Sequence, residues 1–273
     1  MKQEPQTKAT WIWNTSQIDG REAQAVEFAQ EEKVNLIYLH VGKNDFDPQT
    51  YRTFIKEAHQ KGIEVFALGG DPAWALSKHE KSIDKFVQNV KEFNEKVPDE
   101  EKFSGIHVDI EPYLLPEWKK NQDQVIDQWT GNVKHLIRTA KANTNLKVSG
   151  DFPFWLYKVK DPETKESLGK WMISQLDSIT IMAYRDNIQG RNGIKSIATP
   201  LVEQAANQQK SVIVAVNLMK MSDEKHTTFY NQSPAQMKGQ LVELRKEFHG
   251  HPGFGGIAIH DYSHWKKWMK LNS

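Results

Sequence analysis

The stretch GIHVDIEPY, residues 105–113, places three polar side chains within a β-strand pattern. His107, Asp109 and Glu111 alternate with aliphatic residues, and this period of two puts the three polar side chains on one face of a strand. Two carboxylates that point the same way disfavour each other's ionisation, which raises the proton affinity of at least one of them. A carboxyl group that stays protonated near neutral pH is suited to general acid catalysis, so Glu111 and Asp109 are candidate catalytic residues.

The elements that would position these acids follow from the recurrence of apolar runs along the chain. We expect strands at residues 10–14, 34–41, 63–70, 104–111, 146–152, 178–184, 211–218 and 253–260. Apolar strands that alternate with amphipathic helical segments indicate parallel strands with crossover helices. Eight such units in 273 residues predict an α/β fold, a single (β/α)₈ TIM barrel. An open doubly wound sheet is the competing architecture, although no glycine-rich phosphate loop follows any expected strand.

Composition limits the possible partners and chemistry. The 36 basic and 35 acidic side chains give a formal charge of +1, which provides no electrostatic reason to expect a nucleic acid. The absence of cysteine excludes disulfides, thiolate metal sites and a cysteine nucleophile. No apolar stretch approaches the ~20 residues of a membrane span.

The N-terminal segment and the rest of the chain are expected to differ in role. We expect residues 1–9 to form a polar tail and residues 10–273 to form the barrel and catalytic domain. The opening MKQEPQTKAT lacks the apolar core of a signal peptide. We expect an extracellular or cell-surface protein whose signal is absent from this sequence, with a cytoplasmic location left open.

Polar and aromatic residues gather where the expected strands end. In a TIM barrel the active site lies at the carboxyl ends of the strands, so these side chains would share one rim. Acids and amides bind sugar hydroxyls, and large aromatic rings stack on the apolar faces of pyranose rings. The candidate substrate-binding residues are Trp265, Trp155, Trp74, Asp151, His107, Asn217 and Asp261.

Three stretches resemble signatures of a known family. FSGIHVDIEP (103–112), ITIMAYRD (179–186) and GFGGIAIHDYSHW (253–265) are similar to the fourth, sixth and eighth strands of glycoside hydrolase family 18, the chitinase-like TIM barrels. The resemblance implies hydrolysis of an amino-sugar-containing polysaccharide or oligosaccharide, without cofactor or metal. It assigns Glu111 as the general acid, while the substrate's own N-acetyl carbonyl attacks the anomeric carbon. Asp109 and Tyr184 would position that acetamido group.

The chain also departs from the family pattern. Ser104 and His107 stand where the strand-4 signature has aspartates, and Arg185 replaces the aspartate after the strand-6 tyrosine. These departures leave a second interpretation open, a catalytically impaired chitinase-like barrel that only binds carbohydrate. The retained Glu111 favours the hydrolase, because a binding protein has no need of an acid at that position.

The same residues also bear on three other hydrolase mechanisms. A retaining barrel enzyme with a nucleophilic glutamate after strand 7 is disfavoured, because Asn217 occupies that position. An inverting mechanism with Asp151 or Asp261 as the base stays open. A metal-dependent hydrolase is disfavoured, because strand 1 carries Trp11 and Trp13 where barrel amidohydrolases carry two histidines, and no H-E-x-x-H motif occurs.

Overall fold

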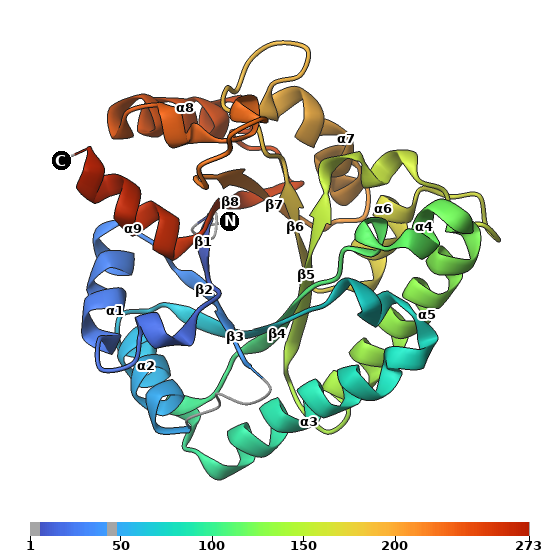
Figure 1. The fold of residues 1–273 in the computed structure, drawn as a ribbon, viewed down its shortest axis with the longest axis horizontal. Helices are drawn as coiled ribbons and strands as arrows, with labels where there is room; N and C mark the ends of the chain where they lie inside the picture. Colours follow the sequence, from blue (N-terminus) through green and yellow to red (C-terminus); the bar gives the residue numbers. More distant parts are fainter. Residues whose placement is uncertain (1–5, 43–47, 273) are drawn as a thin grey trace.

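The computed structural model describes residues 6–42 and 48–272 and shows a closed barrel of parallel strands (Figure 1). Each strand pairs with the next in sequence, and the eighth pairs with the first. The predicted TIM barrel is therefore confirmed. The strands are β1 (Thr7–Ile12), β2 (Leu36–His40), β3 (Glu64–Gly69), β4 (Gly105–Asp109), β5 (Lys147–Pro153), β6 (Ser178–Met182), β7 (Val212–Asn217) and β8 (Phe254–His260).

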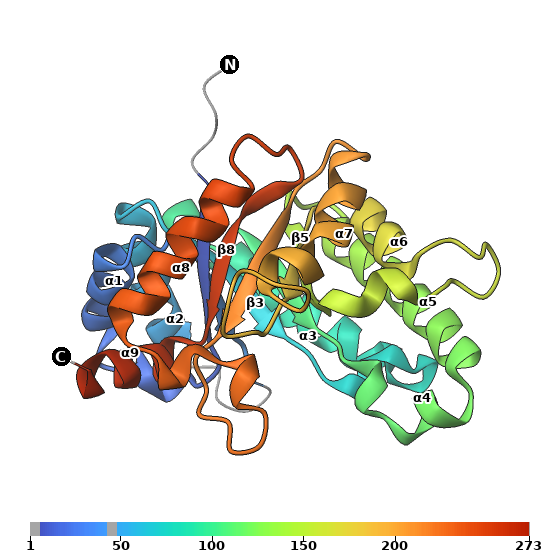
Figure 2. The same ribbon diagram turned by 90° about the horizontal axis from the view of Figure 1, so that it is seen from above.

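Helices surround the barrel as an outer ring, and the turned view shows α4 at its lower edge (Figures 1 and 2). The helices are α1 (Glu22–Glu31), α2 (Pro48–Gln60), α3 (Glu80–Lys96), α4 (Pro116–Lys120), α5 (Gln122–Lys141), α6 (Leu168–Gln175), α7 (Ile194–Ala206), α8 (Pro234–Glu247) and α9 (Tyr262–Leu271). Among the described residues, no helix is both long and apolar enough to cross a bilayer.

The first strand begins earlier than the sequence predicts. Strand β1 starts at Thr7 and ends at Ile12, whereas the expected strand covered residues 10–14. Residues 7–9, which we assigned to the polar tail, therefore pair with β8 inside the barrel sheet. Residues 1–5 of that tail lie outside the described residues. Thr7 and Lys8 are polar, but hydrogen bonds to the neighbouring strands hold them in the sheet.

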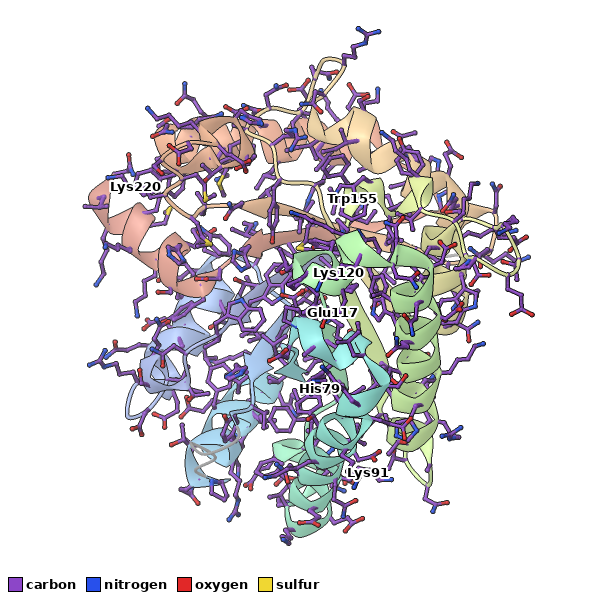
Figure 3. All side chains as sticks on the ribbon, turned by 45° about the vertical axis from the view of Figure 1, so that its right-hand side comes forward. His79, Lys91, Glu117, Lys120, Trp155 and Lys220 are labelled. Atoms are coloured by element: carbon purple, nitrogen blue, oxygen red, sulfur yellow. The ribbon has the colours of Figure 1, made fainter. Side chains whose placement is uncertain are left out.

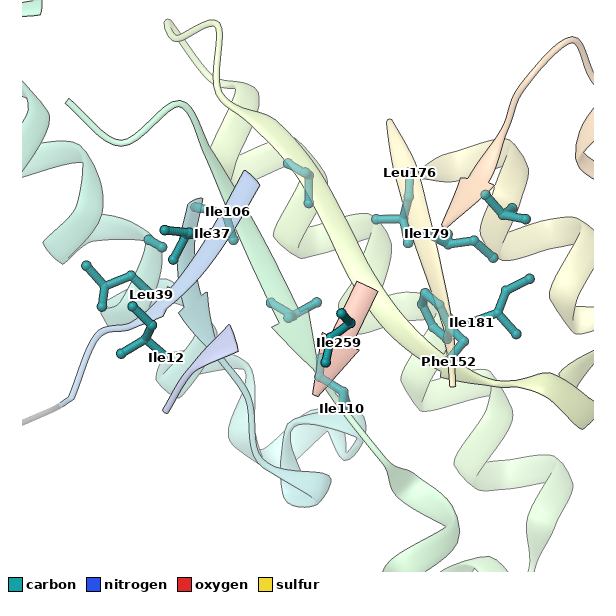
Figure 4. Packing of buried hydrophobic residues seen from close by; sticks show 14 of the residues in the cluster. Ile12, Ile37, Leu39, Ile106, Ile110, Phe152, Leu176, Ile179, Ile181 and Ile259 are labelled. Atoms are coloured by element: carbon teal, nitrogen blue, oxygen red, sulfur yellow. The ribbon is translucent and has the colours of Figure 1, made fainter. Parts of the chain in front are cut away.

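The main hydrophobic core lies between the strands and the helices (Figure 4). Alternate residues of β4 and β6, such as Ile106, Val108, Ile179 and Ile181, point outward into this layer. Helices supply the opposing face at the period expected of an amphipathic helix. In α3 the buried positions are Ile83, Phe86, Val87, Val90 and Phe93.

The barrel interior is divided into an apolar part and a polar part. A second cluster of apolar side chains, which includes Trp11, Tyr38 and Phe66, fills the apolar part. Its residues come from β1, β2, β3, β7 and β8. Strands β4, β5 and β6 instead carry buried polar residues there: His107, Ser149, Asp151 and Thr180. Buried polar groups are costly unless they are paired, so this half of the barrel is a candidate for function rather than for stability alone.

Candidate active site

The two acids of the opening stretch lie at the mouth of the barrel, at the carboxyl end of β4. Asp109 is the last residue of β4, and Glu111 follows after the buried Ile110. Pro112 then begins a short 3₁₀ helix, Pro112–Leu114, which turns the chain away from the barrel. Both acidic side chains are half-buried, so they are reachable from solvent but poorly hydrated.

A glycine on the neighbouring strand allows this close arrangement. Gly70 follows β3 with φ +158°, and a Cβ placed there would lie 2.1 Å from the Asp109 carbonyl oxygen. Any larger residue would push the end of β4 away from β3. The position of Asp109 therefore depends on a residue without a side chain.

Burial and neighbouring charges raise the pKa of both acids. Burial is the largest influence that raises the pKa of Asp109 well above its ordinary value, followed by the charges of Asp151 and Glu111. The pKa of Glu111 is raised by burial and, to a smaller extent, by Asp151. A hydrogen bond donated by the Tyr113 hydroxyl to Glu111 Oε2 acts in the opposite direction, because it stabilises the carboxylate. Nothing in the sequence indicated this contact between Tyr113 and Glu111.

Tyr184 lies two residues beyond the end of β6, and its half-buried ring packs against the inner cluster. Burial raises the pKa of its hydroxyl, and the charges of Asp151, Asp109 and Glu111 raise it further. The phenol therefore stays protonated and can donate a hydrogen bond. The structure thus brings the three predicted catalytic residues, Glu111, Asp109 and Tyr184, to the same end of the barrel.

Asp151 and His107 lie deeper than expected. Their exposed fractions are 3% and 0%, so both lie beneath the mouth, and their contact with substrate stays a prediction. Asp151 Oδ2 accepts a hydrogen bond of 2.8 Å from Trp11 Nε1 and lies 2.9 Å from His107 Nε2, which is out of line for a good hydrogen bond. His107 Nδ1 lies 2.7 Å from Ser149 Oγ. These residues form a polar network beneath the acids.

Aromatic residues border the mouth on two sides. Trp155, in the 3₁₀ helix Phe154–Lys158, is half-buried and meets the Tyr113 ring edge-on at 5.0 Å on the side of α4 (Figure 3). Trp13 follows β1, is half-buried, and donates a hydrogen bond of 3.1 Å to His260 Nε2. Trp13 lies two residues after the buried Trp11, so both fall on the same face of the expected strand. The period of two that identified the acids could therefore also have selected Trp13.

Two other predicted tryptophans are core residues. Trp265 is 1% exposed, and in α9 it packs outside the barrel against Phe28, with Lys8 Nζ 4.9 Å above its ring. Its position on the outer side of the barrel does not favour the predicted contact with substrate. Trp74 is 5% exposed, packs on Phe86 and is one of the residues that line a cavity of ≈ 530 Å³ beside β2 and β3. Neither ring offers a free face for stacking on a sugar.

Asn217 and Asp261 make local hydrogen bonds, and their predicted contact with substrate stays a prediction. Asn217 Oδ1 accepts a hydrogen bond of 2.9 Å from the Met219 amide, and the residue is 4% exposed. Asp261 is 5% exposed and caps α9 through a hydrogen bond of 3.0 Å from the His264 amide. With Asp151 also buried, neither alternative base for an inverting mechanism is open to an attacking water.

The histidines near the barrel mouth do not form a three-ligand metal site among the described residues. His40, His107 and His260 occur in no set of three ligand atoms within 4.8 Å; the set that satisfies this limit in residues 6–42 and 48–272 is Glu80, Asp84 and His135. That set lies between α3 and α5, away from the mouth, and Arg138 Nη2 lies 2.8 Å from His135 Nδ1. A guanidinium at this distance opposes a bound cation.

Comparison with known proteins was informative only at the level of structure. No protein-family model matches the chain, and no curated protein matches it either. Solved structures do match. A chitinase from Chromobacterium violaceum is 13% identical with a TM-score of 0.61, and the match covers 98% of this chain and 99% of that one.

Two further matches agree. A family 18 chitinase from Cycas revoluta in complex with (GlcNAc)₃ is 10% identical with a TM-score of 0.55, covering 97% of this chain and 98% of that one. The spore cortex-lytic enzyme of Bacillus cereus is 11% identical with a TM-score of 0.58, covering 98% of this chain and 74% of that one. The chain has the fold of the family 18 chitinases. The resemblance inferred from three sequence stretches is therefore confirmed at the level of the fold.

Proposed function

We propose that this protein is a glycoside hydrolase that cleaves polymers containing N-acetylated amino sugars, with Glu111 as the general acid. The observation that supports this most strongly is the pair Glu111 and Asp109 at the mouth of the barrel, where burial raises the pKa of both carboxyl groups. A protonated carboxyl group that faces an open rim can donate to a glycosidic oxygen near neutral pH.

The proposed reaction uses each group according to its surroundings. Tyr113 donates to Glu111 Oε2, which leaves the Oε1 atom to carry the proton that passes to the leaving oxygen. The carbonyl oxygen of the substrate's acetamido group attacks the anomeric carbon as that bond breaks. Asp109 accepts a hydrogen bond from the acetamido N–H, and the Tyr184 hydroxyl donates to the acetamido oxygen. Water then opens the cyclic intermediate, and Glu111 regains its proton.

The substrate class is supported by what the structural neighbours act on. The neighbours include chitinases, one of them in complex with a GlcNAc oligosaccharide, and a spore cortex-lytic enzyme. Chitin-type and peptidoglycan-type polymers are therefore the candidate substrates. Because such polymers do not enter cells, we also propose an extracellular or cell-surface location, which fractionation of the producing cells tests.

The decisive experiment is product analysis of the wild type and the Glu111→Gln variant with chitin, peptidoglycan and their oligosaccharides. We expect turnover to fall by about 10²–10⁴-fold in the variant, because general acid catalysis contributes that much, while oligosaccharide binding persists. Glu64→Gln is the matched control, since Glu64 begins β3 at the opposite end of the barrel and pairs with Lys147.

The same experiment separates the enzyme from the carbohydrate-binding alternative. A wild-type protein that binds these oligosaccharides but releases no product would contradict the hydrolase. A Glu111→Gln variant as active as the Glu64→Gln control would remove Glu111 from the mechanism. Binding would be followed by calorimetry, so that it is measured independently of turnover.

A further inference from the structure

Asp109 has a second acidic neighbour, on the adjacent strand. In the register of β4 and β5, Asp109 pairs with Asp151, and both side chains point into the barrel. Neighbouring strands lie about 4.8 Å apart, so two carboxyl groups at paired positions on one face are close to each other. Sequence reasoning did not connect these residues, which are separated by the whole of α5.

Each of the two acids has one buried oxygen without a hydrogen-bond partner in the described structure. These atoms are Asp109 Oδ1 and Asp151 Oδ1. The other oxygen of Asp151, Oδ2, accepts a hydrogen bond from Trp11 Nε1, which leaves Oδ1 as the atom without a partner. Buried polar atoms without partners are rare and costly, and one proton placed between these two oxygens would satisfy both.

We propose that Asp109 and Asp151 share one proton between their Oδ1 atoms, and that Asp151 is a positioning residue that takes this proton when Asp109 ionises against the substrate. This inference rests on the proposed function. The step is balanced: the proton leaves Asp109 Oδ1 and binds Asp151 Oδ1, so the pair carries a charge of −1 before and after. The barrel mouth therefore avoids holding two adjacent carboxylates during turnover.

The surroundings of Asp151 suit a residue that alternates between two protonation states. Trp11 donates to Oδ2 in either state, because a carboxylate and a carbonyl oxygen both accept. His107 lies beside the same oxygen and is fixed in orientation by Ser149 and by stacking on Tyr38, with ring centroids 3.6 Å apart.

Other titratable groups surround the pair and must be counted in any pH experiment. Their charges interact with Asp109 or Asp151 or with groups that face them. They come from β2, β4, the turn after β4, the segment after β6, β8 and the N-cap of α9. They are Tyr38, His107, Glu111, Tyr113, Tyr184, His260 and Asp261.

Infrared spectroscopy of protein labelled with ¹³C at the aspartate carboxyl groups tests the shared proton without requiring activity. We expect the wild type to show a protonated aspartic acid band that persists well above the pH at which ordinary aspartates ionise. Asp109→Asn should abolish this band, because no second carboxyl group is then left beside Asp151 to share the proton. Asp151→Asn should make it titrate at a lower pH, because Asp109 loses a negative neighbour.

Kinetics provide the second measurement. We expect Asp151→Asn to lower kcat by about 10²-fold with little change in KM. The reason is that Asp109 is then misplaced toward the substrate, and a misplaced group costs about that factor. The double variant Asp109→Asn/Asp151→Asn should be no slower than Asp109→Asn alone, because the two residues act as a unit. Asp161→Asn is the matched control, a buried carboxyl group in a loop outside the site.

The outcomes separate this inference from the proposed function. A band that is unchanged in Asp151→Asn, or kinetic losses that multiply in the double variant, would overturn the shared proton even in an active enzyme. Absence of any hydrolysis would overturn the proposed function, while the infrared titration would still decide the inference.

If Asp151→Asn does not fold, Trp11→Phe replaces it. Removing that donor should make the band titrate at a higher pH, and an unchanged titration would count against the proposal.

Discussion

At the scale of single residues, the proton affinity of Glu111 is set by opposing influences from named neighbours. Burial is the largest of them and raises the pKa, the hydrogen bond from Tyr113 lowers it, and the charge of Asp151 raises it. A general acid must be protonated when the substrate binds, so the basic limb of the pH–activity profile reports this pKa. Each neighbour should therefore move that limb in a known direction.

Tyr113→Phe tests this directly. The variant loses the hydrogen bond that stabilises the ionised form of Glu111, so the pKa of Glu111 should rise further above its ordinary value. Glu111 then stays protonated to higher pH, and the basic limb of kcat/KM should move toward higher pH. Tyr230→Phe, a tyrosine in the 3₁₀ helix Phe229–Asn231, should leave the limb in place. A shift toward lower pH would contradict the assigned role of Tyr113.

At the scale of elements, the site depends on how closely the ends of β3 and β4 approach. Strand pairing brings Gly69 beside Val108, and Gly70 then passes directly over the backbone of Asp109. Strand pairing fixes the backbone at the end of β4, and Gly70 leaves space for that backbone to pass close by. Neither would place Asp109 at the mouth without the other.

Gly70→Ala should therefore disturb both stability and catalysis. A methyl group 2.1 Å from the Asp109 carbonyl oxygen forces the strand ends apart, at a cost of about 1–3 kcal/mol in the free energy of unfolding, and kcat should fall with it. The matched control is Gly131→Ala in α5, where a Cβ meets nothing within 4 Å. That variant should gain up to about 1 kcal/mol, as helical glycines do when replaced. Denaturant unfolding measures both, and equal stabilities would refute the steric argument.

At the scale of the whole molecule, the barrel separates its aromatic residues into those that border the mouth and those that hold the helices in place. Trp13 is half-buried beside His260 at the carboxyl ends of the strands. Trp265 is 1% exposed between α9 and α1, on the outside of the barrel. The two tryptophans should therefore respond to truncation in opposite ways.

Trp13→Ala should weaken oligosaccharide binding by about 1–3 kcal/mol with a small effect on stability, because the stacking surface and its buried area are lost. Trp265→Ala should cost about 3–5 kcal/mol in the free energy of unfolding and leave the affinity of the folded protein unchanged. Calorimetric titration and denaturant unfolding of both variants check this pattern. A reversed pattern would place the sugar-binding surface elsewhere.

The sequence predicted more of this molecule than its low identity to solved structures suggests. The strands were located to within a few residues, because a buried parallel strand is a local apolar run whatever surrounds it. Glu111 and Asp109 were found for the same reason, since a period of two along one strand decides which side chains share a face. Their meeting with Tyr184 followed from the general rule that strand ends of a barrel share one rim.

Contacts between strands could not be obtained in this way. The pairing of Asp109 with Asp151 depends on the register of β4 and β5, and the hydrogen bond from Trp11 to Asp151 crosses the interior of the barrel. The position of Trp265 depends on which face of α9 packs against α1. The sequence by itself determined the barrel and the acids that end its fourth strand, because local periodicity along the chain predicts both. Only the tertiary structure decided which buried partners surround those acids, because closing the barrel sets strand register and helix orientation through contacts between distant segments.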